Sequence, residues 1–198
     1  MLSCIILSAG LSTRFTAPKA LAKIQGGLTV IEHLQTMLLK TSLDEIIVVL
    51  GAGADKIKPL LFNHKKIKNV YHQDYLLGQT SSFKEGLKNI HPQSEGIMCF
   101  PVDYPVVQQA TIVELMKYFF EKKPTILIPT FENKKGHPPI FSAQLKNEFF
   151  NLDNHLGLNT IVHQYELQTI LLPVKDRGVI ESFNTQEEFE RIKIQYLG

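Results

Sequence analysis

The sequence of 198 residues is poor in cysteine, and its two cysteines, Cys4 and Cys99, form no C-x-x-C pair. Each lies in an apolar run typical of a strand, so we expect buried free thiols in a reducing compartment. The N-terminus lacks a cationic segment followed by a long apolar stretch, and no apolar run reaches membrane-spanning length. These absences predict a cytoplasmic protein that does not use a membrane.

The charge is also nearly balanced, at a formal net value of +2, and charged residues make up 20% of the chain. No excess of one sign indicates a surface that coats nucleic acid. A hydrophobic content of 44% is typical of a globular protein. We therefore expect one domain over residues 1–198, with any phosphate-binding cations acting locally.

Several well-known catalytic patterns are missing. The sequence contains neither the G-x-x-x-x-G-K-[S/T] phosphate loop nor the G-x-G-x-x-G dinucleotide fingerprint. Its seven histidines show no H-E-x-x-H spacing, which argues against a zinc site. No Ser/His/Asp set or pair of acids has a convincing spacing, so we expect catalysis by alignment and charge neutralisation.

Short apolar runs alternate with helical patterns, which predicts a three-layer α/β/α, Rossmann-like fold around a doubly wound, mostly parallel sheet. The polar run 131–136 lies between two short strands and predicts a hairpin that brings an antiparallel strand into the sheet. The expected strands are 4–7, 46–50, 69–72, 97–100, 125–128, 139–141, 169–172 and 179–183. The capping-box pattern S/T-x-x-E predicts helix starts at Thr29, Ser82, Thr111 and Thr185.

The segment that follows the first strand carries the clearest functional signal. Small residues Ser8, Ala9 and Gly10 allow a ligand to approach backbone N–H groups, and the cations Arg14 and Lys19 follow in the same loop. This pattern predicts a polyphosphate site. The alternative is an ordinary strand-to-helix turn with two exposed cations.

Two further segments fall where ligands collect in such a fold, beyond the carboxyl ends of the strands. Asp103 directly follows the expected strand 97–100, where a single carboxylate can bind Mg²⁺ together with phosphate oxygens and water. Its alternative role is to cap a turn before the next helix. Residues 78–82, G-Q-T-S-S, precede a helix and offer polar groups to a nucleobase, although capping explains one of the two serines.

At this point the chain resembles a known family. Residues 7–19, L-S-A-G-L-S-T-R-F-T-A-P-K, are similar to the L-A-A-G-x-S-x-R-M-G-x-x-K signature of MobA-like nucleotidyltransferases. Residues 78–86 resemble the second segment of that family, and residues 103–105 resemble its D-x-P metal motif. The G-H-P at 136–138 and the N-T-x-E-E at 184–188 match further segments, in family order. The resemblance implies a fold of the nucleotide-diphospho-sugar transferase type.

The resemblance is closest to molybdenum-cofactor cytidylyltransferases. Their first loop carries A-A-G where guanylyl enzymes carry A-G-G, and this chain has Ser8-Ala9-Gly10 there; the pair Ser81-Ser82 is likewise of the cytidylyl type. It implies Mg²⁺ as cofactor, CTP as nucleotide and a phosphorylated acceptor such as molybdopterin, with a molybdoenzyme as recipient of the product. The chain departs from the family at Phe15, at Thr16 and at residues 154–157. The β-branched Thr16 replaces a glycine, so the loop must bend differently there.

The proposed reaction is attack of an acceptor phosphate on the α-phosphorus of a nucleotide, with pyrophosphate leaving. Arg14, Lys19 and Asp103 are the expected catalytic residues, with Asp103 and Asn184 at the metal. His137 is assigned to the acceptor, although a structural role in a tight turn fits it equally well. The expected nucleotide-binding residues are Leu7, Ala9, Gly10, Ser12, Arg14, Lys19, Gln79, Ser81 and Ser82.

Two other interpretations stay open. The first keeps the reaction and changes the acceptor to a sugar phosphate or another small phosphorylated metabolite. The second is a non-catalytic protein that binds a nucleotide or delivers a cofactor, a class suggested by Thr16 and by residues 154–157. Both loop cations and the carboxylate Asp103 argue against the second interpretation.

Overall fold

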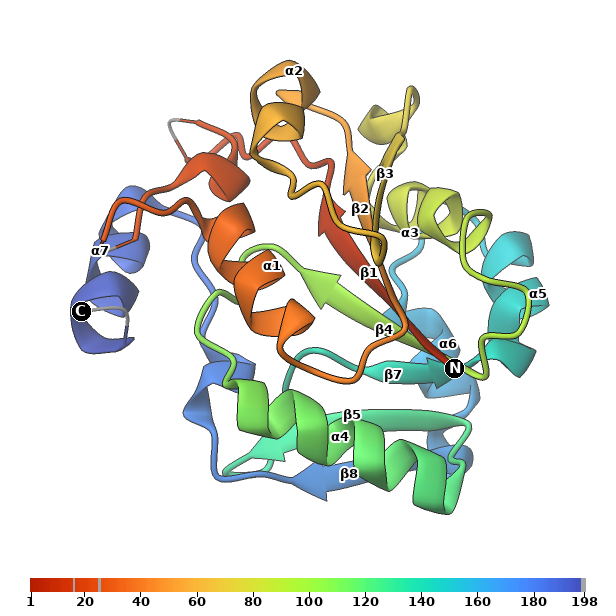
Figure 1. The fold of residues 1–198 in the computed structure, drawn as a ribbon. Coiled ribbons are helices and arrows are strands. Elements are labelled where there is room, and N and C mark those ends of the chain that lie inside the picture. Colours follow the sequence, from red (N-terminus) through yellow and green to blue (C-terminus); the bar gives the residue numbers. More distant parts are fainter. Residues whose placement is uncertain (16, 25, 197–198) are drawn as a thin grey trace.

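The computed structural model describes residues 1–15, 17–24 and 26–196 (Figure 1). Its centre is β1 (Leu2–Ser8), whose seven residues are all buried. Strands β2 (Glu45–Leu50) and β4 (Gly96–Pro101) flank it in parallel, and β3 (Ile67–Tyr71) extends the parallel part beyond β2. Because β1 and its two neighbours are buried on both faces, their sequences are almost continuously apolar.

Within the described residues the sheet has eight strands in the order β3-β2-β1-β4-β7-β5-β6, with β8 (Thr169–Pro173) beside β5. Strand β7 (Ile140–Ser142) runs antiparallel between β4 and β5 (Ile126–Phe131). The predicted hairpin is present, since β6 (Lys134–Lys135) pairs with β5. Its turn residues Glu132 and Asn133 both have positive φ, at 48° and 64°, as a two-residue hairpin turn requires.

Helices cover both faces of the sheet, so the predicted three-layer architecture is confirmed (Figure 1). One core cluster lies between the sheet and α1, α4 and α7, and the other lies between the sheet and α3, α5 and α6. None of the helices in the described ranges is long and apolar enough to cross a membrane. The helices are α1 (Val30–Leu39), α2 (Ala54–Ile57), α3 (Gln79–Leu87), α4 (Gln109–Lys122), α5 (Lys146–Asn151), α6 (Asn159–Gln164) and α7 (Gln186–Tyr196).

The strand predicted at 179–183 is wrong, because this region begins with a short 3₁₀ helix, Arg177–Ile180. Asp176 explains the difference. Its buried carboxylate accepts hydrogen bonds from the backbone of Gly178 and Gln108 at 2.8 Å each, and from Thr111 Oγ1 at 2.7 Å. A side chain that holds the first turn of a helix in this way competes with strand pairing.

Two of the four predicted helix starts are confirmed. Thr29 closes a full capping box with Glu32, and Thr185 does so with Glu188. The starts at Ser82 and Thr111 are wrong. Helix α3 begins at Gln79 after Gly78, and α4 begins at Gln109, because the Thr111 hydroxyl is bonded to Asp176 instead.

Candidate active site

The loop that follows β1 is folded by its own polar groups. Ser12 has a positive φ of 52°, and its carbonyl accepts a hydrogen bond from Phe15 N at 2.8 Å. The Ser12 hydroxyl accepts a second hydrogen bond from Lys19 N at 3.2 Å. The loop therefore turns back on itself, so that a lysine at its far end points toward the carboxyl edge of the sheet.

Phe15 anchors this loop in the core. Its ring is buried and lies edge-on to Phe183, at 5.3 Å between centroids, and to Phe189 of α7, at 5.9 Å. A larger side chain than the methionine of the family signature thus fills a space between the loop and the C-terminal segment. Thr16, where a different bend is expected, lies outside the described residues.

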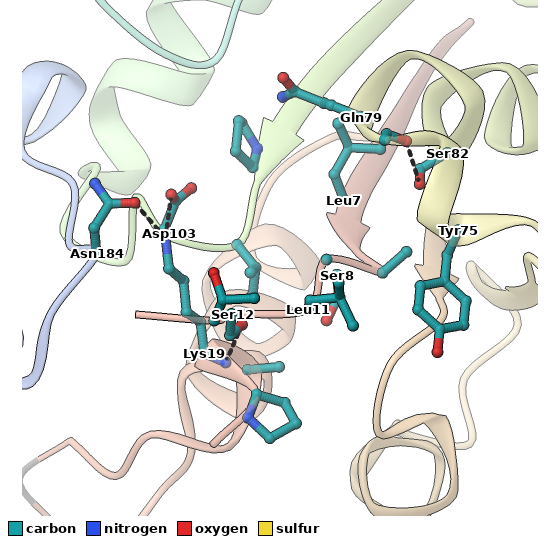
Figure 2. Close-up of a pocket in the computed structure, with 18 of the residues that line it drawn as sticks. Leu7, Ser8, Leu11, Ser12, Lys19, Tyr75, Gln79, Ser82, Asp103 and Asn184 are labelled. Carbon is teal, nitrogen blue, oxygen red and sulfur yellow. Dashed lines mark hydrogen bonds and ion pairs between the residues drawn. The ribbon is translucent and has the colours of Figure 1, made fainter. Parts of the chain in front are cut away.

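The two loop cations converge on oxygens from distant parts of the chain, and Figure 2 shows the contacts of Lys19. Lys19 Nζ donates to Asp103 Oδ2 at 2.8 Å and to Asn184 Oδ1 at 3.0 Å. Arg14 donates to the same Asn184 oxygen at 3.2 Å. Lys19 Nζ also lies 5.4 Å from the centre of the Phe183 ring, a geometry in which the ring attracts the cation. The four predicted polar residues therefore form one cluster.

The turn after β4 positions Asp103, and the N-terminus of α7 positions Asn184. Phe183 N donates to Asp103 O at 3.3 Å, which ties the two segments together. Asn184 N donates to Glu188 Oε2 at 2.6 Å. The pKa of Glu188 is lowered, chiefly because this backbone N–H stabilises its carboxylate. Asn184 is thus held by the same carboxylate that caps the helix.

The opposite wall of the site comes from the start of α3. Gly78 has a φ of 99°, a value that favours glycine, and its carbonyl accepts hydrogen bonds from Ser81 Oγ at 2.9 Å and Ser82 Oγ at 3.0 Å. Ser82 and Gln79 face the cavity. Ser81 does not line it, because its hydroxyl lies 3.0 Å from His72 Nε2 in the interior.

These walls enclose a cavity of about 350 Å³ at the carboxyl end of β1 (Figure 2). It holds every residue predicted for the nucleotide and the metal except Ser81. Sequence reasoning missed Ser8 as a lining side chain, and it missed Tyr75 and Leu76, which belong to a short 3₁₀ helix. The lining side chains of predicted function are Leu7, Ala9, Ser12, Arg14, Lys19, Gln79, Ser82, Asp103 and Asn184, with Gly10 supplying backbone.

A second cavity of about 430 Å³ lies beside the first, and Gln79 lines both. Its wall is largely apolar, with Cys99 and Phe141 among the lining residues, whereas Lys135 and His163 add polar groups. His137 belongs to this cavity and not to the first one. His137 therefore lies in the second cavity, apart from the residues predicted to bind the nucleotide.

His137 is held in a largely apolar setting. Its ring lies against Tyr104, with 4.4 Å between centroids, and its backbone N–H donates to Val179 O at 2.8 Å. Burial lowers the pKa of His137 to about 4, although the nearby Asp103 charge opposes this shift. The imidazole is therefore neutral at pH 7. Its buried Nδ1 has no hydrogen-bond partner among the described residues, and the same is true of Ser8 Oγ in the first cavity.

Comparison with known proteins identifies the family to which the chain belongs. A family model described as the MobA-like NTP transferase domain matches residues 4–169. The curated Bifunctional protein GlmU of Staphylococcus saprophyticus is 25% identical over 223 residues, which cover 95% of this chain and 48% of that protein. The chain thus spans about half the length of this relative.

Many solved structures share the fold, and three of them illustrate it. The Mycobacterium tuberculosis protein Rv0371c, in complex with manganese, has a TM-score of 0.82 and 23% identity, and 98% of each chain is covered. The 2-C-methyl-D-erythritol 4-phosphate cytidylyltransferase IspD of Francisella tularensis has a TM-score of 0.75 and 16% identity, over 98% of this chain and 99% of that one. Molybdopterin-guanine dinucleotide biosynthesis protein A of Archaeoglobus fulgidus has a TM-score of 0.71 and 16% identity, over 97% of each.

Proposed function

The chain is a nucleotidyltransferase that belongs to the MobA-like NTP transferase domain family, and on this premise we propose that it transfers CMP from CTP to a phosphorylated acceptor. The first cavity binds the nucleotide, the second cavity binds the acceptor, and pyrophosphate is released. Molybdopterin is the acceptor that we propose first.

One observation carries the proposal. Two cations from the first loop meet a carboxylate and an amide from two other segments at the carboxyl end of β1, in the wall of a cavity. A triphosphate brings concentrated negative charge, and cations fixed in advance stabilise the charge that develops on the leaving pyrophosphate. Arg14 offers a planar fork of donors, whereas Lys19 supplies a mobile point charge.

The reaction needs little acid–base chemistry from the protein. An oxygen of the acceptor phosphate attacks the α-phosphorus, and the bond from that phosphorus to the bridging oxygen of the pyrophosphate breaks. A phosphate monoester is already ionised at neutral pH, so no general base is required. The residues align the two substrates and neutralise charge, which is how proteins accelerate phosphoryl-type transfers.

The residues fit a divalent cation. Asp103 Oδ2 and Asn184 Oδ1 converge on a single positive charge, the Lys19 ammonium, at 2.8 and 3.0 Å. Within the described ranges no group of three or more His, Cys, Asp or Glu residues gathers to hold a metal. Mg²⁺ suits such a site because it uses one or two protein oxygens together with substrate phosphates and water. Asp103 and Asn184 would hold the ion, which would supply positive charge to the phosphates, and Lys19 would add a second positive charge beside them.

CTP is proposed as the nucleotide on two grounds. The first loop carries Ser8-Ala9-Gly10, with alanine at the position where the cytidylyl A-A-G differs from the guanylyl A-G-G, and the serines that follow Gln79 are also of the cytidylyl type. In addition, IspD of similar fold is named a cytidylyltransferase. Gln79, Ser82, Ala9 and Gly10 line the same cavity, and Gln79 and Ser82 lie across it from Lys19, where they can contact the base (Figure 2). Ser81, which is bonded to His72, is not retained among the base-contacting residues.

The acceptor is assigned to the second cavity because it adjoins the first at Gln79. A neutral His137 can donate or accept a hydrogen bond there without adding charge. A largely apolar wall favours a flat, partly apolar acceptor such as a pterin over a polyol. A sugar phosphate is the alternative acceptor, and it is suggested by the erythritol phosphate in the name of IspD.

The test is pyrophosphate release with each of CTP, GTP, ATP and UTP in the presence of Mg²⁺. Each nucleotide is paired with molybdopterin, with a sugar phosphate or with no acceptor. We expect release with CTP and molybdopterin and little without an acceptor. Release with a sugar phosphate alone would move the assignment to that acceptor class. Nucleotide binding without release in any combination would favour a non-catalytic protein.

A further inference from the structure

Two side chains of α3 hold the loop that joins α5 to α6. Lys84 Nζ donates to Leu152 O and to Asn154 Oδ1, the latter at 2.9 Å. Thr80 Oγ1 donates to Leu156 O at 2.5 Å. These contacts span about seventy residues of sequence and connect the helix of the nucleotide site to the segment in which the chain departs from its family.

The loop leads directly into one wall of the second cavity. Residues 157–159, at the start of that wall, follow Leu156 without a break, and Val162 and His163 of α6 continue it. The loop has few bonds of its own, chiefly from Leu156 N to Asp153 O at 3.0 Å and from His155 N to Asp153 Oδ1 at 2.8 Å. Leu152 and Leu158 anchor its two ends in the core, and the position of the polar residues between them depends on α3.

The same helix takes part in the first cavity. Gln79, its first residue, lines both cavities, and Ser82 lines the first. Gly86 brings the helix against the sheet, since a Cβ added there would lie 2.6 Å from Ile5 Cγ2. Helix α3 is thus fixed to β1 on one side and holds the loop through Lys84 on the other.

We infer that Lys84 is a positioning residue for the acceptor, because it fixes the wall 157–163 relative to the nucleotide site. The role of that wall as an acceptor site rests on the proposed function. Lys84 touches neither cavity, so it acts through the loop. Since misplacing a reactant by about 1 Å costs up to about 100-fold in rate, we expect the loss of Lys84 to lower kcat/KM for the acceptor about tenfold, through a higher acceptor KM, and to leave nucleotide affinity unchanged.

The experiment compares Lys84→Met with Lys88→Met. Methionine keeps most of the lysine stem and removes the charged donor. Lys88 lies one turn further along the helix and pairs with Glu85 on the surface at 2.7 Å, so its variant loses an equal charge without touching the loop. Lys84→Arg keeps a cationic donor at this position and should bring the acceptor KM and the exchange rates close to the wild-type values.

Three measurements decide the outcome. Amide hydrogen exchange should become faster over residues 152–163 in Lys84→Met and stay unchanged over residues 78–82. The acceptor KM should rise, and the dissociation constant of CTP measured by calorimetry should stay within about twofold of the wild-type value. Lys88→Met should match the wild type in all three.

Unchanged exchange over 152–163 in Lys84→Met overturns the inference, and so does faster exchange with an unchanged acceptor KM. An equal loss of nucleotide affinity also overturns it, because that result indicates general loosening. Failure of the wild type to transfer CMP to any acceptor refutes the proposed function instead. The exchange measurement needs no acceptor, and it still tests the contact between Lys84 and the loop.

Discussion

Replacement of Asp103 by asparagine separates the catalytic role of this carboxylate from its structural one. Asparagine keeps an oxygen that can accept from Lys19 and removes the negative charge. The Lys19 and Asp103 side chains are 13% and 23% exposed, so their ion pair is neither fully solvated nor fully buried. Lys19 also keeps its hydrogen bond to Asn184 at 3.0 Å. We therefore expect the free energy of unfolding to fall by about 1 kcal/mol.

The expected loss of activity is much larger. Removing one fixed charge that stabilises a transition state costs about 3–4 kcal/mol of barrier, or about 10²–10³ in kcat. The assay is pyrophosphate release at saturating CTP, Mg²⁺ and molybdopterin, beside urea unfolding of the same preparations. Glu114→Gln removes a carboxylate from the exposed face of α4 and should match the wild type in both assays. Near-wild-type turnover of Asp103→Asn would refute the assigned role.

Four further substitutions test the packing around the cavities. Ser8→Ala should leave the free energy of unfolding unchanged or slightly higher, because the buried Ser8 hydroxyl has no partner in the described residues. Ser81→Ala should lower it by about 1 kcal/mol in urea unfolding, because the Ser81 hydroxyl is bonded to His72. Between pH 6.5 and about 4 the folded protein binds fewer protons at His137 than the unfolded chain does. The free energy of unfolding should therefore fall as the pH is lowered, by up to about 1.4 kcal/mol per pH unit, and His137→Phe should remove this pH dependence. Gly86→Ala should cost about 1–3 kcal/mol and weaken CTP binding in calorimetry, because its Cβ would press on Ile5 and push α3 away.

The fold was predictable because the buried strands carry a signal that depends on local composition alone. β1 and β4 are apolar at most positions, and segments that contain glycine or proline follow them. The prediction failed at residues 179–183, where an apolar run follows Asp176. The buried bonds of Asp176 to Gln108 and Thr111 come from 65 residues or more away in sequence, and no local pattern reports such partners.

The candidate site was predictable as far as strand ends and residue types determine it. Asp103 and the loop of Arg14 and Lys19 follow two parallel strands, so both lie at the carboxyl edge of the sheet and come into contact there. The direction of neighbouring side chains on a helix was not predictable. Ser81 and Ser82 both donate to Gly78 O, yet only Ser82 reaches the cavity.

Asn184 shows how a local rule acquires a role in the site. The pattern that starts at Thr185 predicts a capping box, and its Glu188 closes the box in the structure. The same carboxylate accepts from Asn184 N at 2.6 Å, one residue before the cap. The start of α7 therefore fixes the backbone from which Asn184 reaches Lys19 and Arg14. Because the cap forms from residues close in sequence, it orients Asn184 without help from the distant segments that this side chain contacts.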